Sequence, residues 1–316
     1  MIMDSRVHPD LKALFSVFPE TKFDKKDLAE IRKQIHQSLE ADIQPSDSLV
    51  SKYYRNIPGT EESPDVPVVI YEPTTKNKIL SGVLWIHGGG YIMGVPEIND
   101  ALCRRFVLET DSVVVAVDYR LAPEHPYPAP VEDCYSALEW FAENANELGV
   151  DSNRIAVAGN SAGGGLTAAV SLLARDRKGP KIAFQMPLYP MIDDRNITPS
   201  SYEITDSRVW NRESNIFGWK AYLGENYDKE VSQYAAPARA TDLSGLPPTY
   251  TCVGELDPFR DETMDYVARL LRAGVPTEFH IYPGCYHGFE TSVVKTNIGQ
   301  RAETQYVEAL KNALNK

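Results

Sequence analysis

The pentapeptide at residues 159–163, which reads Gly-Asn-Ser-Ala-Gly, is the strongest chemical signal in the chain. A strand-like apolar run at 155–158 precedes it, and a helix-like run of small residues at 166–170 follows it. A serine in a sharp strand-to-helix turn is typical of a nucleophile elbow, which holds the hydroxyl above a sheet. Glycines flank such a serine because a side chain there would crowd the crossing backbone. The pattern predicts nucleophilic catalysis by Ser161, and a glycine-rich turn with a solvated serine is the alternative.

A second motif, His-Gly-Gly-Gly at residues 87–90, directly follows the apolar run 83–86. Serine attack on a carbonyl carbon makes a negatively charged oxygen that needs hydrogen-bond donors fixed in advance. Consecutive glycines can turn backbone N–H groups toward such a site, and this motif is a known partner of the elbow. The two motifs together predict acyl transfer, and His87 is expected to organise the loop rather than to act as a base.

The serine also needs a general base, and His287 is the best placed of the six histidines. It lies in a glycine-bounded loop after the strand-like run 277–282, at the end of a strand where sites gather in parallel sheets. His280 lies inside that run, so it is expected to pack or pair there.

An orienting carboxylate is predicted in the loop after the strand-like run 248–253, where Asp257 precedes a proline that favours an extended backbone. Asp261 and Asp265 fall within the helix-like run that follows, and a solvated face is expected for both. The order serine, aspartate, histidine along the chain is the order of α/β-hydrolases.

The sequence resembles the hormone-sensitive lipase family of esterases, whose bacterial members have the α/β-hydrolase fold. Four segments, spanning about residues 80–290, carry the resemblance: HGGG at 87–90, DYRLAPEHPYPAPVED at 118–133, GNSAGG at 159–164, and GELDPFRDE at 254–262 with YHGF at 286–289. One departure is Asn160, where the family more often has Asp or Thr.

Carried over position by position, the resemblance implies Ser161 as nucleophile, Asp257 as orienting carboxylate and His287 as base. It also implies that backbone N–H groups donate to the oxyanion, and that no cofactor is needed. The implied donors are Gly89, Gly90 and Ala162.

Strand-like and helix-like runs alternate along most of the chain, which predicts a mostly parallel sheet flanked by helices. The expected strands are 66–71, 79–86, 112–118, 154–158, 182–188, 248–253 and 277–282, and the expected helices are 98–109, 131–146, 161–175, 260–273 and 301–314.

Two regions fall outside this alternation, residues 1–50 and about 191–240. The first has an apolar helical stripe, and the second has aromatic residues in a helical pattern. In the resembling family such segments form a cap over the active site, so the expected catalytic domain is 51–316, with a cap insertion at about 191–240. The stripe is Leu28, Ile31, Ile35 and Leu39.

Substrate-binding residues are predicted in two places, after the glycine loop and in the insertion. Core packing is the alternative for each of them. The candidates are Tyr91, Ile92, Met93, Trp210 and Phe217.

The composition of the chain limits the kinds of partner that it can be expected to bind. The net charge of −12 argues against nucleic acid and anionic membranes, and no apolar run approaches the length of a membrane span. The four scattered cysteines have no metal-ligand spacing and are expected to be reduced thiols, and no metal is expected. A polar N-terminus favours a cytoplasmic location. A small-molecule ester is the expected partner, and a homodimer is the expected assembly.

The motifs predict a serine acyl-transfer enzyme, and the family resemblance implies a carboxylesterase that acts on short- to medium-chain acyl esters. Two alternatives remain. The same chemistry could act on an amide, a lactone or an acetylated carbohydrate, because the elbow sets the reaction and the cap sets the substrate. The chain could also be a non-catalytic small-molecule receptor of the same fold, but such receptors lack the working histidine and His287 is in place.

Overall fold

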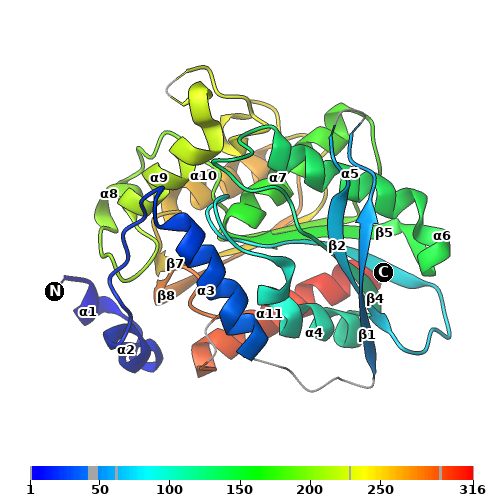
Figure 1. Ribbon diagram of the computed structural model, residues 1–316, viewed down its shortest axis with the longest axis horizontal. Helices are drawn as coiled ribbons and strands as arrows, with labels where there is room; N and C mark the ends of the chain where they lie inside the picture. The colour runs from blue at the N-terminus through cyan, green and yellow to red at the C-terminus, as the bar shows by residue number, and fades with distance from the viewer. Residues whose placement is uncertain (1, 42–48, 61–62, 228, 292–293, 316) are drawn as a thin grey trace.

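A computed structural model describes residues 2–41, 49–60, 63–227, 229–291 and 294–315 of the protein. An eight-stranded sheet in the order β1-β2-β4-β3-β5-β6-β7-β8 runs through it, and helices cover both faces (Figure 1). Strands β3 to β8 are parallel to one another, and β2 is antiparallel to both of its neighbours. The predicted fold class, a mostly parallel sheet flanked by helices, is confirmed.

The strands are β1 (Val50–Ile57), β2 (Val66–Pro73), β3 (Leu80–Ile86), β4 (Ser112–Val117), β5 (Val150–Asn160), β6 (Phe184–Leu188), β7 (Thr249–Leu256) and β8 (Thr277–Tyr286). The α-helices of the described residues are α1 (Ile2–Arg6), α2 (Pro9–Ser16), α3 (Leu28–Ala41), α4 (Asp100–Thr110), α5 (Ala129–Glu143), α6 (Ala145–Leu148), α7 (Ala162–Asp176), α8 (Pro199–Glu203), α9 (Arg212–Leu223), α10 (Arg260–Arg272) and α11 (Asn297–Leu314).

Each predicted strand is present, but β1 was missed. Its sequence, VSKYYRNI, has polar residues and two adjacent tyrosines between its ends, and only its first and last residues are buried. It lies at the edge of the sheet beside β2 alone, so it lacks the apolar run that marks a central strand. The predicted helices are also present, with α11 beginning four residues earlier than expected, at Asn297.

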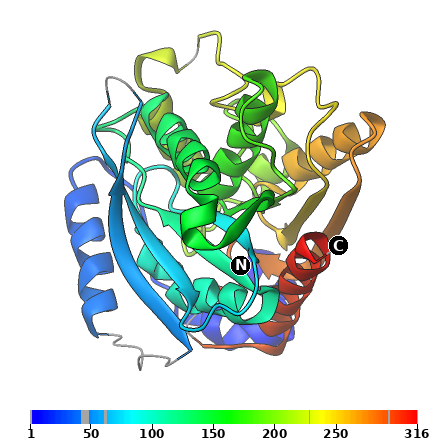
Figure 2. The ribbon, with the colours of Figure 1, turned by 90° about the vertical axis from the view of Figure 1, so that its right-hand side faces the viewer.

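The two faces of the sheet bury two separate clusters of apolar side chains, because successive residues of a strand point to opposite faces. In β4, for example, Val113, Val115 and Val117 enter one cluster, and Val114 and Ala116 enter the other. Helices α5 and α7 cover the first face, and α4 and α11 cover the second (Figure 2).

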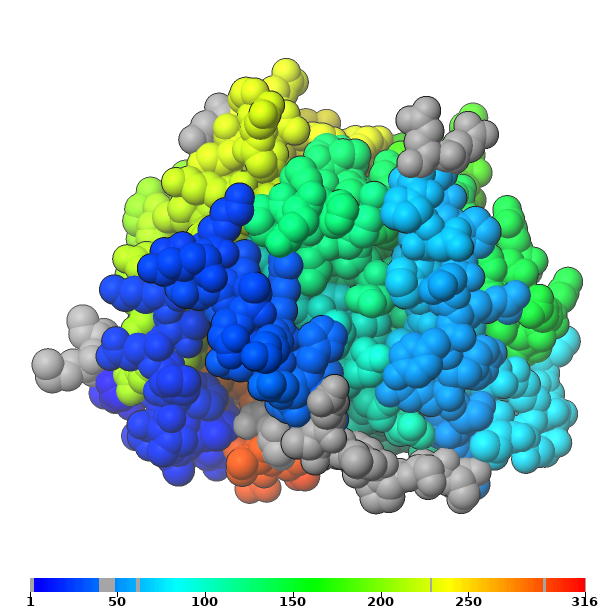
Figure 3. Space-filling view, viewed as in Figure 1, coloured from blue at the N-terminus to red at the C-terminus, as the bar shows by residue number. Residues whose placement is uncertain are grey.

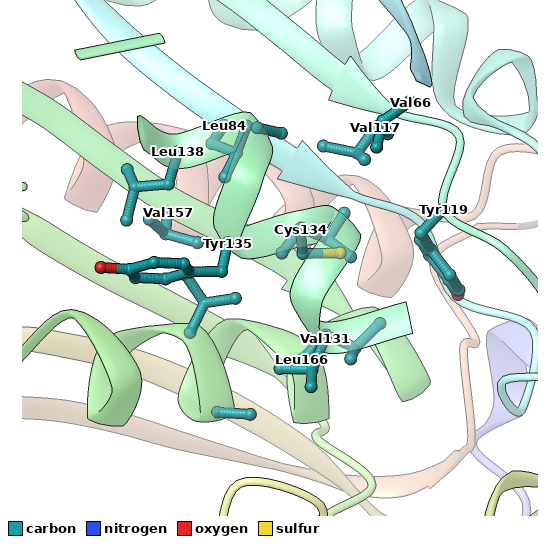
Figure 4. Packing of buried hydrophobic residues seen from close by; sticks show 14 of the residues in the cluster. Val66, Leu84, Val117, Tyr119, Val131, Cys134, Tyr135, Leu138, Val157 and Leu166 are labelled. Carbon is teal, nitrogen blue, oxygen red and sulfur yellow. The ribbon is translucent and has the colours of Figure 1, made fainter. Parts of the chain in front are cut away.

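Figure 4 shows the first cluster, where side chains of α5 lie against those of the central strands. Cys134 and Leu138 of α5 pack next to Leu84 of β3 and Val157 of β5. The apolar residues of α5 recur at helical spacing, so one face of the helix is buried on β3 and β5. These two strands lead into the two glycine motifs, and the packing of α5 helps to hold them in place.

The two regions outside the alternation pack against each other (Figure 3). The Phe23 ring lies 5.5 Å from that of Trp210 and 6.2 Å from that of Phe217, and the Thr21 N–H donates to the Ser207 carbonyl. The predicted apolar stripe lies on α3, where Leu28 is buried and the other three residues are half-buried. Residues 42–48 of the first region lie outside the described residues.

The helical pattern predicted in the insertion corresponds to α9, which carries Phe217, Trp219, Tyr222 and Leu223. Trp210 comes before this helix, because Asn211 accepts a hydrogen bond from the Ser214 N–H and so caps its N-terminus. None of the helices in the described ranges combines the length and the apolar character that a membrane crossing requires.

The first turn of α7 touches the end of β3, and two glycines make this contact possible. A Cβ at Gly163 would lie 2.0 Å from the carbonyl oxygen of Ile86 and 2.5 Å from that of His87. A Cβ at Gly159 would lie 2.5 Å from the same Ile86 oxygen. The glycines predicted to relieve crowding at the elbow therefore do so against the backbone that begins the second glycine motif.

We expect Gly163→Ala to lower the free energy of unfolding by about 3 kcal/mol or more, because backbone atoms cannot yield to the new methyl group. Chemical denaturation followed by circular dichroism measures the change. Gly274→Ala is the matched control, since a Cβ there meets nothing within 4 Å and only the positive φ of 81° opposes it. That control should lose about 1 kcal/mol. Equal losses in the two variants would contradict the proposed crowding.

Candidate active site

Ser161 lies in the turn between β5 and α7, with φ 57° and ψ −119°, a backbone conformation that few non-glycine residues adopt. Its N–H donates to the Leu188 carbonyl at 2.9 Å. Its own carbonyl accepts from the N–H groups of Gly165 at 2.9 Å and Met191 at 3.0 Å. These three hydrogen bonds hold the strained backbone in place and aim the side chain away from the sheet.

Three side chains that the sequence analysis selected meet in one chain of hydrogen bonds. Ser161 Oγ lies 2.8 Å from His287 Nε2, and His287 Nδ1 lies 2.8 Å from Asp257 Oδ2. Asp257 is fully buried, and its other oxygen accepts from the Phe259 N–H at 2.9 Å. A carboxylate at Nδ1 favours the tautomer that carries the proton there, which leaves Nε2 free to accept the serine proton.

The glycine loop after β3 passes directly beside the serine. A Cβ at Gly88 would lie 3.2 Å from the Cβ of Ser161, and Gly89 and Gly90 have φ values of 117° and 60°. In the described part of the chain, no acceptor pairs with the backbone N–H groups of Gly89, Gly90 or Ala162. Unpaired N–H groups that border a nucleophile can receive a developing oxyanion without first giving up another bond.

His87 is buried beneath this loop, which fits the organising role expected for it. Its Nδ1 lies 2.7 Å from the Gly88 carbonyl oxygen, and its ring stacks on that of Tyr119 with 4.3 Å between the centroids. The Tyr119 hydroxyl donates to the His87 carbonyl at 2.9 Å. Burial lowers the pKa of His87 to about 4, so the ring is neutral at pH 7.

A cavity of about 260 Å³ opens beside Ser161. Its wall comes from the glycine loop, the serine turn, the loop of His287, helix α3 and the insertion. The lining residues are Ile35, His87, Gly88, Gly89, Gly90, Met93, Gly94, Ile98, Asn99, Asn160, Ser161, Tyr189, Trp210, His287, Gly288 and Thr291.

Two of the predicted substrate-binding residues line this cavity. Met93 follows the glycine loop, and Trp210 reaches in from the insertion. Trp210 lies over the glycine loop so closely that a Cβ at Gly90 would come within 2.2 Å of its ring. Its ring centroid is 6.4 Å from that of His287. Trp210 is thus positioned to contact whatever occupies the space above the serine.

The other three predicted residues do not line this cavity in the described structure, so their contact with a substrate stays a prediction. Tyr91 is buried in the core, where its hydroxyl donates to the Met191 carbonyl at 2.7 Å and its ring stacks on Tyr222. Ile92 is also fully buried. Phe217 packs against the ring of Phe23. Tyr91 and Ile92 point into the core because the loop turns back toward the sheet after Gly90.

Several lining residues were not predicted. Tyr189 directly follows the strand-like run 182–188, so the rule that sites gather at strand ends could have indicated it. Ile35 was visible only as part of an amphipathic stripe. Asn99 and Thr291 carry no local signal, because tertiary packing alone brings them to the cavity.

The remaining ionisable candidates lie away from the triad geometry. His280 pairs with Glu278 at 2.9 Å, as a residue inside the strand. Asp265 is exposed, as expected, but Asp261 is half-buried and accepts from the Ser200 N–H at 2.7 Å, so it helps to fix α8. The cysteines are all buried and free. No cluster of metal-binding side chains occurs among the described residues.

Comparison with known proteins identifies the family. A family model described as the alpha/beta hydrolase fold matches residues 83–291. The chain belongs to the α/β-hydrolase family. Within it, the chain is 36% identical over 314 residues to carboxylesterase NlhH of Mycobacterium tuberculosis, covering 98% of this chain and 96% of that protein. It is 34% identical to an arylesterase of Saccharolobus solfataricus, over 89% of this chain and 91% of the relative.

Solved structures give the same picture of the hydrolase. A bacterial heroin esterase superposes with a TM-score of 0.92 at 40% identity, and the match covers 98% of each chain. Esterase LipW from Mycobacterium marinum superposes with a TM-score of 0.91 at 35% identity, over 99% of this chain and 98% of that one. The resemblance to hormone-sensitive-lipase-type esterases, inferred from four sequence segments, is therefore confirmed.

Proposed function

We propose that this α/β-hydrolase is a serine carboxylesterase in which Ser161 is the nucleophile, His287 the general base and Asp257 the orienting carboxylate. The observation that carries the proposal is the continuous chain from Ser161 Oγ through His287 to Asp257, with 2.8 Å at each step. The relatives at full-length coverage are named as carboxylesterases and esterases, which supports the same reaction class here.

In the acylation half, Ser161 Oγ attacks the ester carbonyl carbon while His287 Nε2 takes the hydroxyl proton. The carbonyl π electrons move to oxygen, and the N–H groups of Gly89, Gly90 and Ala162 receive the oxyanion. The tetrahedral intermediate then collapses, the bond to the alkoxy oxygen breaks, and the alcohol leaves with the proton from His287.

In the deacylation half, a water molecule takes the place of the alcohol. His287 removes a proton from this water as its oxygen attacks the acyl-enzyme carbon, and the same three N–H groups hold the second oxyanion. The bond to Ser161 Oγ then breaks, the proton returns to the serine, and the carboxylic acid leaves. Buried Asp257 keeps the imidazole oriented in both halves and stabilises its charged form.

The other substrate classes and the non-catalytic receptor can be distinguished from an esterase by experiment. An amide, a lactone or an acetylated carbohydrate would use the same groups. A receptor without turnover is disfavoured because His287 stands within hydrogen-bonding distance of Ser161. The homodimer and the cytoplasmic location stay predictions.

We expect Ser161→Ala to abolish hydrolysis of nitrophenyl esters and His287→Ala to cost nearly as much, because the members of a triad act as a unit. Steady-state kinetics of folded variants gives the losses, which should be about a thousandfold or more in kcat. His280→Ala is the matched control and should keep the parent rate. If His280→Ala loses activity and His287→Ala keeps it, the assignment of His287 as the base is wrong. If only amides or acetylated sugars are turned over, the proposed substrate class is wrong.

We further propose that short to medium acyl chains, of about two to eight carbons, are preferred. The cavity of about 260 Å³ lies below the range of roughly 300–1,000 Å³ that is usual for drug-sized ligands. Trp210 closes part of it and is itself held by the ring of Phe23. A long chain would have to displace this indole and the N-terminal segment behind it.

Trp210→Ala should therefore raise the ratio of kcat/KM on long over short nitrophenyl esters by about tenfold, as expected when several buried methylenes gain room. The measurement is a panel from two to sixteen acyl carbons. Phe217→Ala removes a ring that contacts Phe23 outside the cavity wall, so it should lower stability and leave the ratio unchanged. An unchanged ratio in Trp210→Ala would show that this residue does not limit chain length.

We also propose that residues 1–50 and about 191–240 form a cap on the catalytic domain 51–316. Arg32 of α3 supports this division. Its Nε donates to the Ile92 carbonyl and one Nη to the Ala122 carbonyl, each at 2.8 Å, and it forms a two-armed ion pair with Glu124 at 2.9 and 3.0 Å. Because the Ile92 N–H donates to the Gly89 carbonyl at 3.0 Å, Arg32 is one hydrogen bond away from the glycine loop.

Arg32→Ala should lower kcat/KM on a good ester by about tenfold, since a loop that loses its support positions the reacting groups less well. Arg32→Lys should not restore the rate, because one ammonium group cannot make the forked contacts. Lys33→Ala is the control on the same helix, where the side chain is exposed. If Arg32→Ala folds normally and keeps the parent kinetics, α3 does not support the glycine loop.

A further inference from the structure

A buried carboxyl group that the reaction described above does not use lies close to the triad. Glu290 stands three residues after His287 and is only 4% exposed. Its Oε1 accepts a hydrogen bond from the Tyr189 hydroxyl. Within the described residues, its Oε2 has no hydrogen-bond partner. Burial raises the pKa of Glu290 above its ordinary value, as expected for a carboxyl removed from water. Such a group is costly to bury and calls for a function.

Tyr189 connects Glu290 to the catalytic histidine. Its ring meets the imidazole of His287 edge-on, with 5.1 Å between the centroids and 83° between the planes. Its backbone has a φ of 32°, in the left-handed region that a bulky residue seldom adopts. The backbone is held by its N–H, which donates to the Cys252 carbonyl at 2.8 Å, and the side chain is held by Glu290.

Asn160 connects the same hydroxyl to the nucleophile. It is the last residue of β5 and precedes Ser161, and its Nδ2 donates to the Tyr189 hydroxyl oxygen at 3.3 Å. The Tyr189 hydroxyl therefore donates to one side chain and accepts from another, which uses its hydrogen-bonding capacity in two fixed directions. Asn160 also borders the glycine loop, since a Cβ at Gly88 would lie 3.3 Å from its Oδ1.

We propose that Glu290, Tyr189 and Asn160 form a positioning chain that holds His287 and Ser161 in register; this inference rests on the proposed function. The positioning chain links Asn160 at the end of β5, Tyr189 directly after β6 and Glu290 in the turn after β8. The nucleophile Ser161 follows β5, and the base His287 follows β8. The positioning chain also reaches β7 through the Cys252 carbonyl. A side-chain network that spans four neighbouring strand ends can fix distances that no single loop fixes.

The three residues act through others: Asn160 and Tyr189 also line the cavity, but none of the three takes part in the hydrogen bonds that join Ser161, His287 and Asp257. The Tyr189 hydroxyl is occupied by Glu290 and Asn160, so it does not donate to a substrate. What the chain sets is the orientation of the imidazole, which Tyr189 contacts edge-on and which Phe259 also contacts edge-on at 5.0 Å. Phe259 is fully buried and held by the core. Tyr189 is buried as well, and its hydroxyl, through Glu290 and Asn160, adds two hydrogen bonds to the packing that holds its ring.

The decisive variant is Tyr189→Phe, which keeps the ring and removes the hydroxyl. It should lower kcat about tenfold and change KM less than twofold on a short nitrophenyl ester, because binding is intact and the imidazole is held less firmly. Glu290→Leu should give a similar loss. The double variant should lose no more than either single variant, because both remove the same connection. Tyr266→Phe is the matched control, since it removes a buried hydroxyl that has no partner among the described residues and should leave kcat unchanged.

Glu290→Gln provides the rescue. Its amide oxygen can still accept from Tyr189, and its NH₂ replaces an oxygen that makes no bond in the described structure, so kcat should stay within twofold of the parent. A parent-like kcat in Tyr189→Phe, or additive losses in the double variant, would overturn the positioning chain. A loss in Glu290→Gln as large as in Glu290→Leu would also overturn it, because charge and not position would then be at work. Each of these outcomes is independent of Ser161→Ala, whose failure to abolish hydrolysis would instead overturn the proposed function.

Discussion

The contact between the first turn of α7 and the end of β3 is the constraint on which the rest of the site depends. Gly159 and Gly163 let the backbone of the elbow pack so closely on the end of β3 that a methyl group at either position would overlap it. The strained Ser161 lies between these two glycines. Because β3 continues directly into the glycine loop, this one contact sets both the height of the serine hydroxyl and its distance from the unpaired N–H groups of the loop. The nucleophile and the proposed oxyanion donors are therefore positioned by the same few backbone atoms.

The remaining catalytic groups reach the site by a different principle, the convergence of strand ends. Parallel strands place their following loops on one edge of the sheet, so Asp257 after β7 and His287 after β8 meet Ser161 although they lie far apart in sequence. Convergence alone leaves each loop free to shift. The hydrogen bonds of Tyr189 and the buried ring of Phe259 reduce that freedom, which is why the polar groups behind the triad matter as much as the triad distances.

The parts of the fold that could be predicted from sequence are those with a local cause. Glycines at fixed spacing, apolar runs and a proline after Asp257 each act on their own neighbourhood, and they located the elbow, the glycine loop and the central strands. The edge strand β1 was missed because polar side chains cover most of it. Tyr91 and Ile92, which were expected beside the substrate, are buried outside the lining of the cavity, and nothing in their local sequence shows which way the loop turns after Gly90. The roles of Arg32 and Glu290 arise from contacts with residues distant in sequence, so no local pattern could have indicated them.

Chemistry and substrate choice are thus encoded in different kinds of structure. The proposed acyl transfer depends on groups attached to the central strands, where motifs are short and backbone geometry is tightly limited. The cavity wall beyond them is completed by Ile35 of α3 and by Trp210, from the two segments outside the β/α alternation. These segments contact each other through aromatic rings, and they contact the core through buried side chains such as Leu28 and Trp219 and through the hydrogen bonds of Arg32. The motifs therefore indicate the reaction. The choice of substrate depends on how side chains outside the motifs pack around the cavity.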